Sequence, residues 1–255
     1  TGASALIAAG YALLGEVGLY VTTPIVALLA LAATWALVHE VLRDEPAPVC
    51  YLTAALTVAL LATSPEHVDR LLVPMADAAA QLFTVLTLLF ILRGSRHLSA
   101  GRLSPLDWIL AGLAFAWAYW VRHTQLVLVV AVVLVAIREL RNWEIGKSGT
   151  WLAGAPAPRF PDSPIPRFPG SLITALTLFA LSALLGALPD ILYRLRWFGG
   201  VFNTETTELP LMALQHIVPV AGEMARAALA AGEWGYLFPL ALYGAWRLAH
   251  ERRWQ

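Results

Sequence analysis

Asp77 is the residue whose type and position most clearly suggest chemistry. It follows Pro74-Met75-Ala76 and lies about one turn inside a long apolar stretch. An ionised carboxylate in an apolar helix is costly to bury, so we expect its side chain to face protein, water or a cation rather than lipid. A structural interpretation stays open, because an acid in the first turn of a helix also pairs with the helix dipole or with a cation such as Arg70.

A tight hairpin at residues 120–125 separates two apolar stretches and carries Arg122 and His123. The arginine presents a planar fork of donors that suits a phosphate at a membrane surface. It could equally extend to lipid headgroups as an ordinary cation at a helix end. A satisfied interfacial histidine is the simpler explanation for His123.

Polar side chains gather in two further segments. Residues 64–70 contain Glu66, His67 and Asp69, for which solvated loop charge is the usual explanation. Residues 190–209 begin with Asp190 and combine arginines with aromatic residues, a glycine pair and hydroxyl groups. Such a mixture suits recognition of a sugar and a phosphate, although loops are polar in general.

Other chemistries have no support in the sequence. No phosphate-binding glycine loop, dinucleotide fingerprint, His-Glu-x-x-His pair or cysteine ligand set occurs. Cys50 is the single cysteine, and we interpret it as a small core residue. Seventeen basic residues balance seventeen acidic ones, so a basic surface for nucleic acid is not expected.

Membrane-spanning helices are expected to carry these residues. The chain is 59% hydrophobic and only 13% charged, with a mean hydropathy of +0.68, which leaves too little polar surface to cover a soluble domain. Apolar runs of this length suit helices that cross a bilayer. We therefore predict an all-α, polytopic integral membrane protein with about seven transmembrane helices, at residues 24–42, 49–63, 75–92, 105–120, 123–140, 171–189 and 236–249.

The remaining segments complete one transmembrane domain over residues 1–255. Residues 3–14 are too short to span and predict an interfacial or re-entrant helix. Residues 142–170 carry six prolines and predict an extended cytoplasmic linker, while residues 193–235 predict an outer loop with an interfacial helix. Because the chain begins at Thr1 without a methionine, we expect a fragment of a longer protein.

Charge placement predicts the orientation in the cell membrane. Alternating the spans puts twelve of the seventeen Lys and Arg residues on one side, which the positive-inside rule makes cytoplasmic. Asp77 and Arg122 then fall at the extracytoplasmic face. Tryptophans near the predicted interfaces are expected to act as anchors, and they are Trp108, Trp117, Trp120, Trp197, Trp234 and Trp246.

Four segments together resemble the polytopic GT-C glycosyltransferases, in particular the bacterial dolichyl-phosphate-mannose-protein mannosyltransferase-like enzymes. Residues 3–15 are similar to a Leu- and Gly-containing stretch of that family, and residues 71–81 to a helix start with an acid before small residues. Residues 112–126 resemble an apolar span that runs into an Arg-containing hairpin. Residues 197–209 are similar to the family's Phe-Gly-x-Phe loop with following Thr and Glu residues.

The resemblance implies transfer of a sugar from a polyprenyl-phosphate carrier to a protein, lipid or glycan acceptor on the outer face. It implies that Asp77 belongs to the catalytic site, with a divalent cation as its one candidate cofactor. Glu66 and Asp69 are looser candidates for catalytic acids. The family's principal catalytic acid would lie upstream of Thr1, so the fragment is expected to lack it. The predicted substrate-binding residues are Arg122 for the carrier phosphate, then Arg194 and Arg196, with His123, Arg70, Asn203 and Glu205.

Three other functions stay open. A secondary transporter or permease should show internal repeats and broken helices with polar groups near the bilayer midplane, whereas the ionisable residues here cluster at helix ends. A non-catalytic assembly protein would tolerate alanine at Asp77 and Arg122. An oligosaccharide ligase or polymerase would share the same carrier chemistry.

Overall fold

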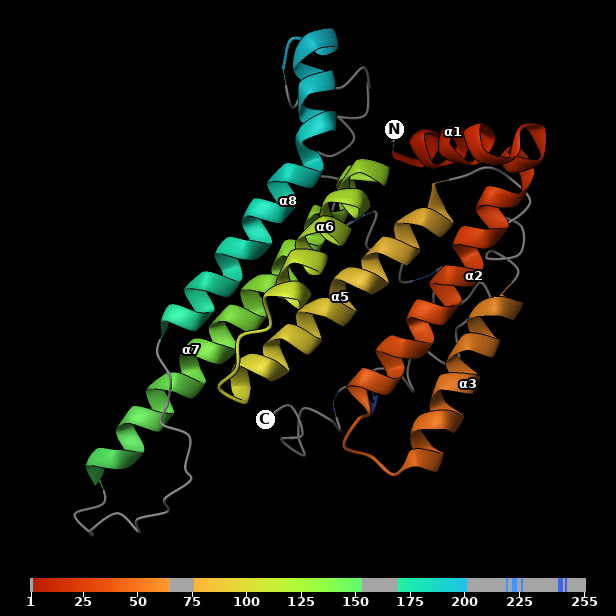
Figure 1. The fold of residues 1–255 in the computed structure, drawn as a ribbon. Helices are drawn as coiled ribbons and strands as arrows, with labels where there is room; N and C mark the ends of the chain where they lie inside the picture. The colour runs from red at the N-terminus through yellow and green to blue at the C-terminus, as the bar shows by residue number, and fades with distance from the viewer. Residues whose placement is uncertain are drawn as a thin grey trace. The chain divides into compact units, whose positions relative to one another are not determined.

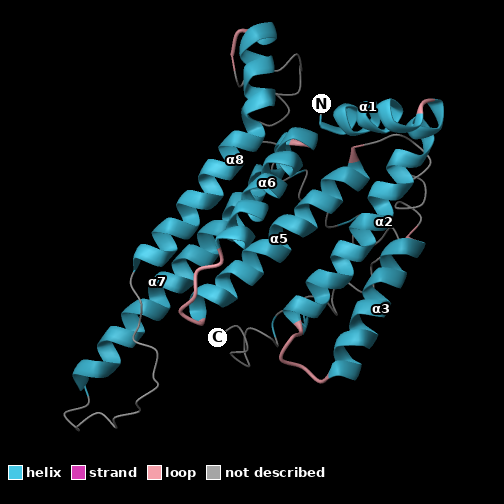
Figure 2. Ribbon diagram, viewed as in Figure 1, coloured by secondary structure: helices cyan, strands magenta, loops and turns pink. Residues whose placement is uncertain are grey.

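The computed structural model describes residues 2–64, 76–152 and 169–200, with a few single positions between residues 219 and 246. Within these ranges the regular elements are helices, and no strand occurs (Figure 2). The chain forms two compact units, residues 1–193 and residues 194–255. The helices below belong to the first unit, except for the last residues of α8.

The chain opens with a short helix, α1 (Gly2–Leu14), followed by a long one, α2 (Glu16–Val41). Gly15 between them has a φ of 63°, a left-handed conformation that glycine adopts without strain. As a result α1 lies across the end of the bundle (Figure 1). The predicted short opening helix is therefore present. The predicted start of the next span at Pro24 is wrong, because α2 continues through this proline, as membrane helices often do.

Three helices follow, and two of them have a proline in the first turn. They are α3 (Ala47–Thr63), α5 (Asp77–Ser99) and α6 (Pro105–Val121). Proline is tolerated in the first turn of α3 and of α6, because the N–H group that it lacks would have no partner within the helix at that position. Cys50 of α3 is buried, as predicted for a small core residue, and its thiol donates to the Leu42 carbonyl oxygen at 2.7 Å.

A 3₁₀ helix, η1 (His123–Val127), joins α6 to α7 (Leu128–Leu152), and α8 (Pro169–Phe198) completes the unit. Two predicted boundaries move. Helix α7 continues to Leu152, so the predicted linker cannot be extended from residue 142, and its first proline comes only at Pro156. Helix α8 continues through Pro189, which places Asp190 in a helix rather than in a loop.

Four helical segments are long and apolar enough to cross a membrane. They are Glu16–Val41, Asp77–Ser99, His123–Arg141 and Gly170–Trp197. Helices α1, α3 and α6 are apolar but shorter. The chain is thus an all-α membrane protein. The last predicted span, residues 236–249, lies outside the described residues apart from single positions, so the count of seven spans stays a prediction.

Small residues let the helices approach closely around a core of α5, α6, α7 and α8. Its buried members include Ile91, Trp108 and Phe179. Trp108 is 0% exposed, and a Cβ added at Gly94 would lie 2.7 Å from its Nε1. The prediction that Trp108 anchors the protein at an interface is therefore wrong, because Gly94 leaves space for the indole inside the bundle.

A second feature is a set of charged side chains where α2 and α5 end, which we call the Glu40 end. Glu40 is 8% exposed, and its carboxylate oxygens lie 3.1 Å from Arg96 Nη1 and 3.4 Å from Arg93 Nε. Next to Arg96, His97 Nε2 lies 3.7 Å from Asp107 Oδ2 of α6. These contacts join three helices, since a buried carboxylate is tolerated when cations and hydrogen bonds compensate it.

Candidate active site

The opposite end of the same bundle, where α5 begins and α6 ends, holds Asp77 and is called the Asp77 end. Asp77 is the first residue of α5, where an acid interacts favourably with the helix dipole. Arg96 lies nineteen positions further along α5, which corresponds to about 28 Å along a helix. The two charged regions are therefore separate sites.

Asp77 forms an ion pair with Arg122, between the carboxylate Oδ1 and the guanidinium Nη2. The acid side chain is 16% exposed, whereas the arginine side chain is 46% exposed. The carboxylate is thus held inside the protein, as predicted. The guanidinium has five N–H donors, so the donors that do not face Asp77 can reach a further anion.

The local backbone explains how Arg122 reaches this position. Helix α6 ends at Val121, and Arg122 adopts an extended conformation with φ −145° and ψ 117° before η1 begins. Its N–H donates to the Ala118 carbonyl oxygen at 2.9 Å, and its carbonyl oxygen accepts from the Gln125 N–H at 3.0 Å. The predicted tight hairpin between the two spans is confirmed.

Side chains from two other helices hold this hairpin. Thr84 of α5 donates through Oγ1 to Gln125 Oε1 at 2.9 Å. His123 Nε2 lies 3.7 Å from Asp190 Oδ2 of α8, and the His123 ring packs edge-on against Tyr119. The sequence contained a signal for Asp190, an acid within an apolar run. The predicted span ends at Pro189, however, which leaves Asp190 in a loop.

An aromatic cluster lies near the Asp77 end. Phe83 of α5 stacks on Trp117 of α6 with ring centroids 5.4 Å apart, and the Trp117 ring centroid lies 4.9 Å from that of Trp120.

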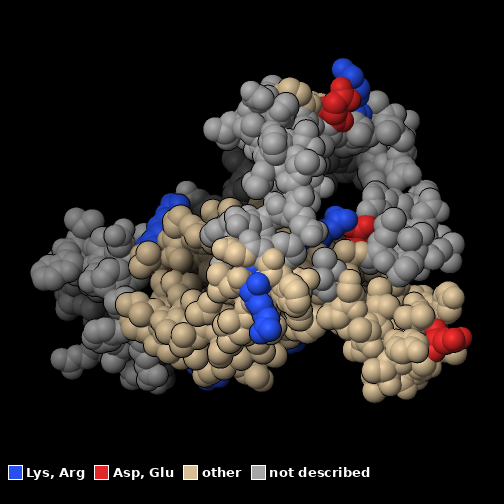
Figure 3. Space-filling view, turned by 90° about the horizontal axis from the view of Figure 1, so that it is seen from above, with Lys and Arg blue, Asp and Glu red and all other residues tan. Residues whose placement is uncertain are grey.

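Figure 3 shows the surface of the protein from above the view of Figure 1, on the side where α1 lies. Among the described residues, it shows few charged side chains within a largely uncharged surface.

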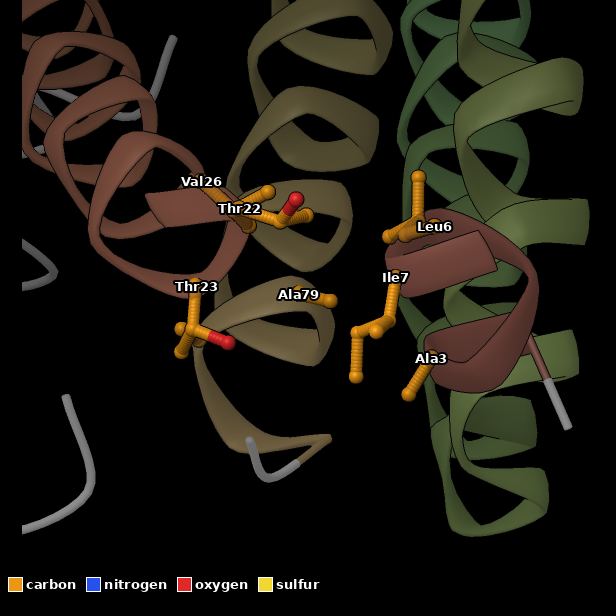
Figure 4. A pocket seen from close by; sticks show the side chains of 8 residues that line it. Ala3, Leu6, Ile7, Thr22, Thr23, Val26 and Ala79 are labelled. Atoms are coloured by element: carbon orange, nitrogen blue, oxygen red, sulfur yellow. The ribbon is translucent and has the colours of Figure 1, made fainter. Parts of the chain in front are cut away.

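An open recess lies directly beside the start of α5, where α1 crosses α2. It is open to the surroundings, and its cavity volume of about 10 Å³ is enough for about one water molecule. Ala3, Leu6 and Ile7 of α1 line one side, and Thr22 and Val26 of α2 the other (Figure 4). Thr23, Ala78 and Ala79 complete the lining. Ala78 and Ala79 directly follow Asp77 in α5, and the lining of the recess is uncharged.

Apart from His123, the described structure does not place the other predicted site residues relative to this pair. Residues outside the described ranges are Glu66, His67, Asp69, Arg70, Asn203 and Glu205. Arg194 and Arg196 belong to the second compact unit. Their assignment to the site stays a prediction.

The described residues do not by themselves form a divalent-cation site at Asp77. Its Oδ1 faces the Arg122 guanidinium, and within the described ranges no group of three or more His, Cys, Asp or Glu side chains could hold a metal ion. No step of the chemistry below is therefore assigned to a cation, and the cation stays a prediction.

The fold and this site define an integral membrane protein with paired charges at the helix ends of an α-helical bundle. Residues 2–157 match the family described as dolichyl-phosphate-mannose-protein mannosyltransferase, which is more than half of the chain. The chain belongs to this family and is a membrane glycosyltransferase of the GT-C type. Comparisons with curated proteins and with solved structures give no match.

Proposed function

We propose that this protein transfers a sugar from a polyprenyl-phosphate carrier to an acceptor at the outer face of the cell membrane. The observation that carries the proposal is the ion pair between Asp77 and the half-exposed Arg122 in a chain of the mannosyltransferase family. The orientation rests on the excess of Lys and Arg in the loops at the other side of the predicted topology.

The reaction breaks the bond between the anomeric carbon and the carrier phosphate oxygen. A bond forms between that carbon and an acceptor oxygen, whose proton passes to a carboxylate, and the carrier leaves as polyprenyl phosphate. Positive charge that develops on the sugar is stabilised by nearby acids. Fixed donors directed at the departing phosphate stabilise the negative charge there.

Arg122 is our candidate for the phosphate-binding group. Its fork of donors suits a phosphate, and Asp77 holds it at the site while part of the fork stays accessible. We assign Asp77 a supporting catalytic role, in which it orients Arg122 and adds negative charge near the sugar. Glu66 and Asp69 are further candidate acids, and the donor-binding candidates also include Arg70, His123, Arg194, Arg196, Asn203 and Glu205.

The recess beside Asp77 supports a lipid substrate. Its lining consists of alanine, aliphatic and threonine side chains, and such a surface favours an alkyl or prenyl group over a sugar. A carrier bound with its phosphate at Arg122 could run its first lipid carbons along this uncharged surface. The acceptor is a protein, a lipid or a glycan.

The test uses the full-length protein purified and reconstituted in lipid vesicles with radiolabelled polyprenyl-phosphate sugars. Label is followed in protein, lipid and glycan acceptors, with and without a chelator. We expect wild-type turnover that Asp77→Asn and Arg122→Ala each reduce by a factor on the order of 100, while a lipid-facing variant, Leu184→Ala, retains it. Absence of transfer from any carrier, together with protein-dependent uptake of a solute into vesicles, would refute the proposal and favour a transporter.

A further inference from the structure

Asp190 of α8 is a buried acid that the chemistry above does not use. It is 4% exposed and lies beyond residues 2–157, the part of the chain that matches the family. A carboxylate inside a membrane helix bundle is costly unless other groups compensate its charge. Its position therefore calls for a role that involves its neighbours.

The neighbour from the hairpin is His123. Asp190 Oδ2 lies 3.7 Å from His123 Nε2, and the histidine side chain is 40% exposed. On another side of the ring, Tyr119 packs edge-on with a centroid distance of 4.8 Å. The carboxylate and the tyrosine together restrict where the imidazole can lie.

His123 is joined directly to Arg122, which pairs with Asp77 of α5. Two adjacent residues of one hairpin thus face carboxylates from two different helices, α5 and α8. Because Arg122 has an extended backbone between two helices, its orientation depends on such contacts more than it would inside a helix. A guanidinium that moves away from this position would bind the carrier phosphate more weakly, which raises KM.

We propose that Asp190 is a positioning residue for the phosphate-binding arginine. Its carboxylate fixes the His123 ring and thereby keeps the hairpin in the geometry that directs Arg122 toward Asp77 and the carrier phosphate. This inference rests on the proposed function of the site, and it extends that site to α8.

The experiment is a double-mutant cycle in the reconstituted full-length protein. The variants are Asp190→Asn, His123→Phe and their combination, and the readouts are KM for the polyprenyl-phosphate sugar and kcat. His123→Phe keeps the ring against Tyr119 but removes the nitrogen that faces Asp190. We expect each single variant to raise KM about tenfold with kcat within about twofold, and the double variant to be no worse than either single one. Asp190→Glu keeps the charge and should remain within about threefold of the wild-type KM.

A matched control exists at the Glu40 end. His97 Nε2 and Asp107 Oδ2 are also 3.7 Å apart, with a half-exposed histidine and a largely buried acid. The same cycle with Asp107→Asn and His97→Phe should lower the thermal midpoint but leave KM unchanged. A change in KM that occurs only in the Asp190 cycle separates positioning from a general loss of stability.

Several results would overturn the inference. One is an Asp190→Asn variant that loses thermal stability as Asp107→Asn does but keeps the wild-type KM. Another is an additive effect of Asp190→Asn and His123→Phe. If Asp190→Asn does not fold, a wild-type KM in the His123→Phe variant would also overturn the inference. These results leave wild-type transfer intact, whereas a wild type that transfers no sugar refutes the proposed function and, with it, the role of Asp190 toward the carrier.

Discussion

The two ends of the bundle contain the same dipeptide in two different settings. At the Glu40 end, Arg96 pairs with Glu40 and the adjacent His97 faces Asp107. At the Asp77 end, Arg122 pairs with Asp77 and the adjacent His123 faces Asp190. Each Arg-His pair thus meets carboxylates from two other helices.

The backbone and the exposure distinguish the two settings. Arg96 and His97 lie in the last turns of α5, and the Arg96 side chain is 27% exposed. Arg122 lies in an extended link between α6 and η1, and its side chain is 46% exposed. Glu40 also faces Arg93, so two arginines share one acid at that end. We infer that the Glu40 end joins helices, whereas the Asp77 end keeps donors accessible to a ligand.

The largest expected effect comes from exchanging the charges of the Asp77 end. The double variant Asp77→Arg with Arg122→Asp keeps an ion pair but moves the guanidinium to α5. Transfer should fall by a factor on the order of 100 or more. The thermal midpoint should fall by only a few degrees, because the cost of a cation at a helix N-terminus is about 1 kcal/mol. Recovery of transfer in the exchanged variant, relative to Arg122→Asp alone, would mean that the pair is structural.

At the Glu40 end, Glu40→Gln should affect stability and not catalysis. Removing the charge leaves Arg93 and Arg96 without their shared carboxylate. Because both arginines are partly exposed, we expect a loss of about 1–3 kcal/mol, less than for a fully buried pair. Thermal unfolding in detergent measures it, with sugar transfer below the midpoint as the control. Loss of transfer in a folded Glu40→Gln protein would contradict the division between the two ends.

A smaller effect is expected from Thr84→Val, which removes the hydrogen bond from α5 to the hairpin at Gln125. We expect a loss of about 1 kcal/mol and an increase of a few-fold in KM for the carrier. The matched control is Thr87→Val one turn further along α5, because the Thr87 hydroxyl donates within its own helix, to the Phe83 carbonyl oxygen. Equal KM values for the two variants would show that Thr84 does not support the hairpin.

The smallest effect is expected from Arg43→Ala. Arg43 lies 4.0 Å from Glu40, with a side chain that is 67% exposed. Exposed ion pairs of this kind contribute little, so the change in unfolding free energy should stay within about 0.5 kcal/mol. A loss as large as that of Glu40→Gln would show that the Glu40 end depends on Arg43 as well as on Arg93 and Arg96.

Much of the fold was available from the sequence because hydropathy and proline placement act locally. These two signals predicted the short opening helix, the spans up to the one in α8, and the hairpin at Arg122. Some predicted helix ends were wrong because a local signal was misleading. Proline does not interrupt α2 or α8, and α7 continues into polar residues after its apolar part. The candidate residues Asp77 and Arg122 were recognisable because a charge beside an apolar run is costly without a partner.

Sequence alone thus determined that this protein is a helical membrane protein of a mannosyltransferase type, and that an acid and an arginine lie at helix ends on one side. The packing of the helices was needed to show that these two residues pair, that His123 faces Asp190, and that Trp108 is buried beneath Gly94. The physical reason is that the helical period fixes which residues share a face of one helix, whereas the neighbour of that face depends on close packing with segments far away in the chain.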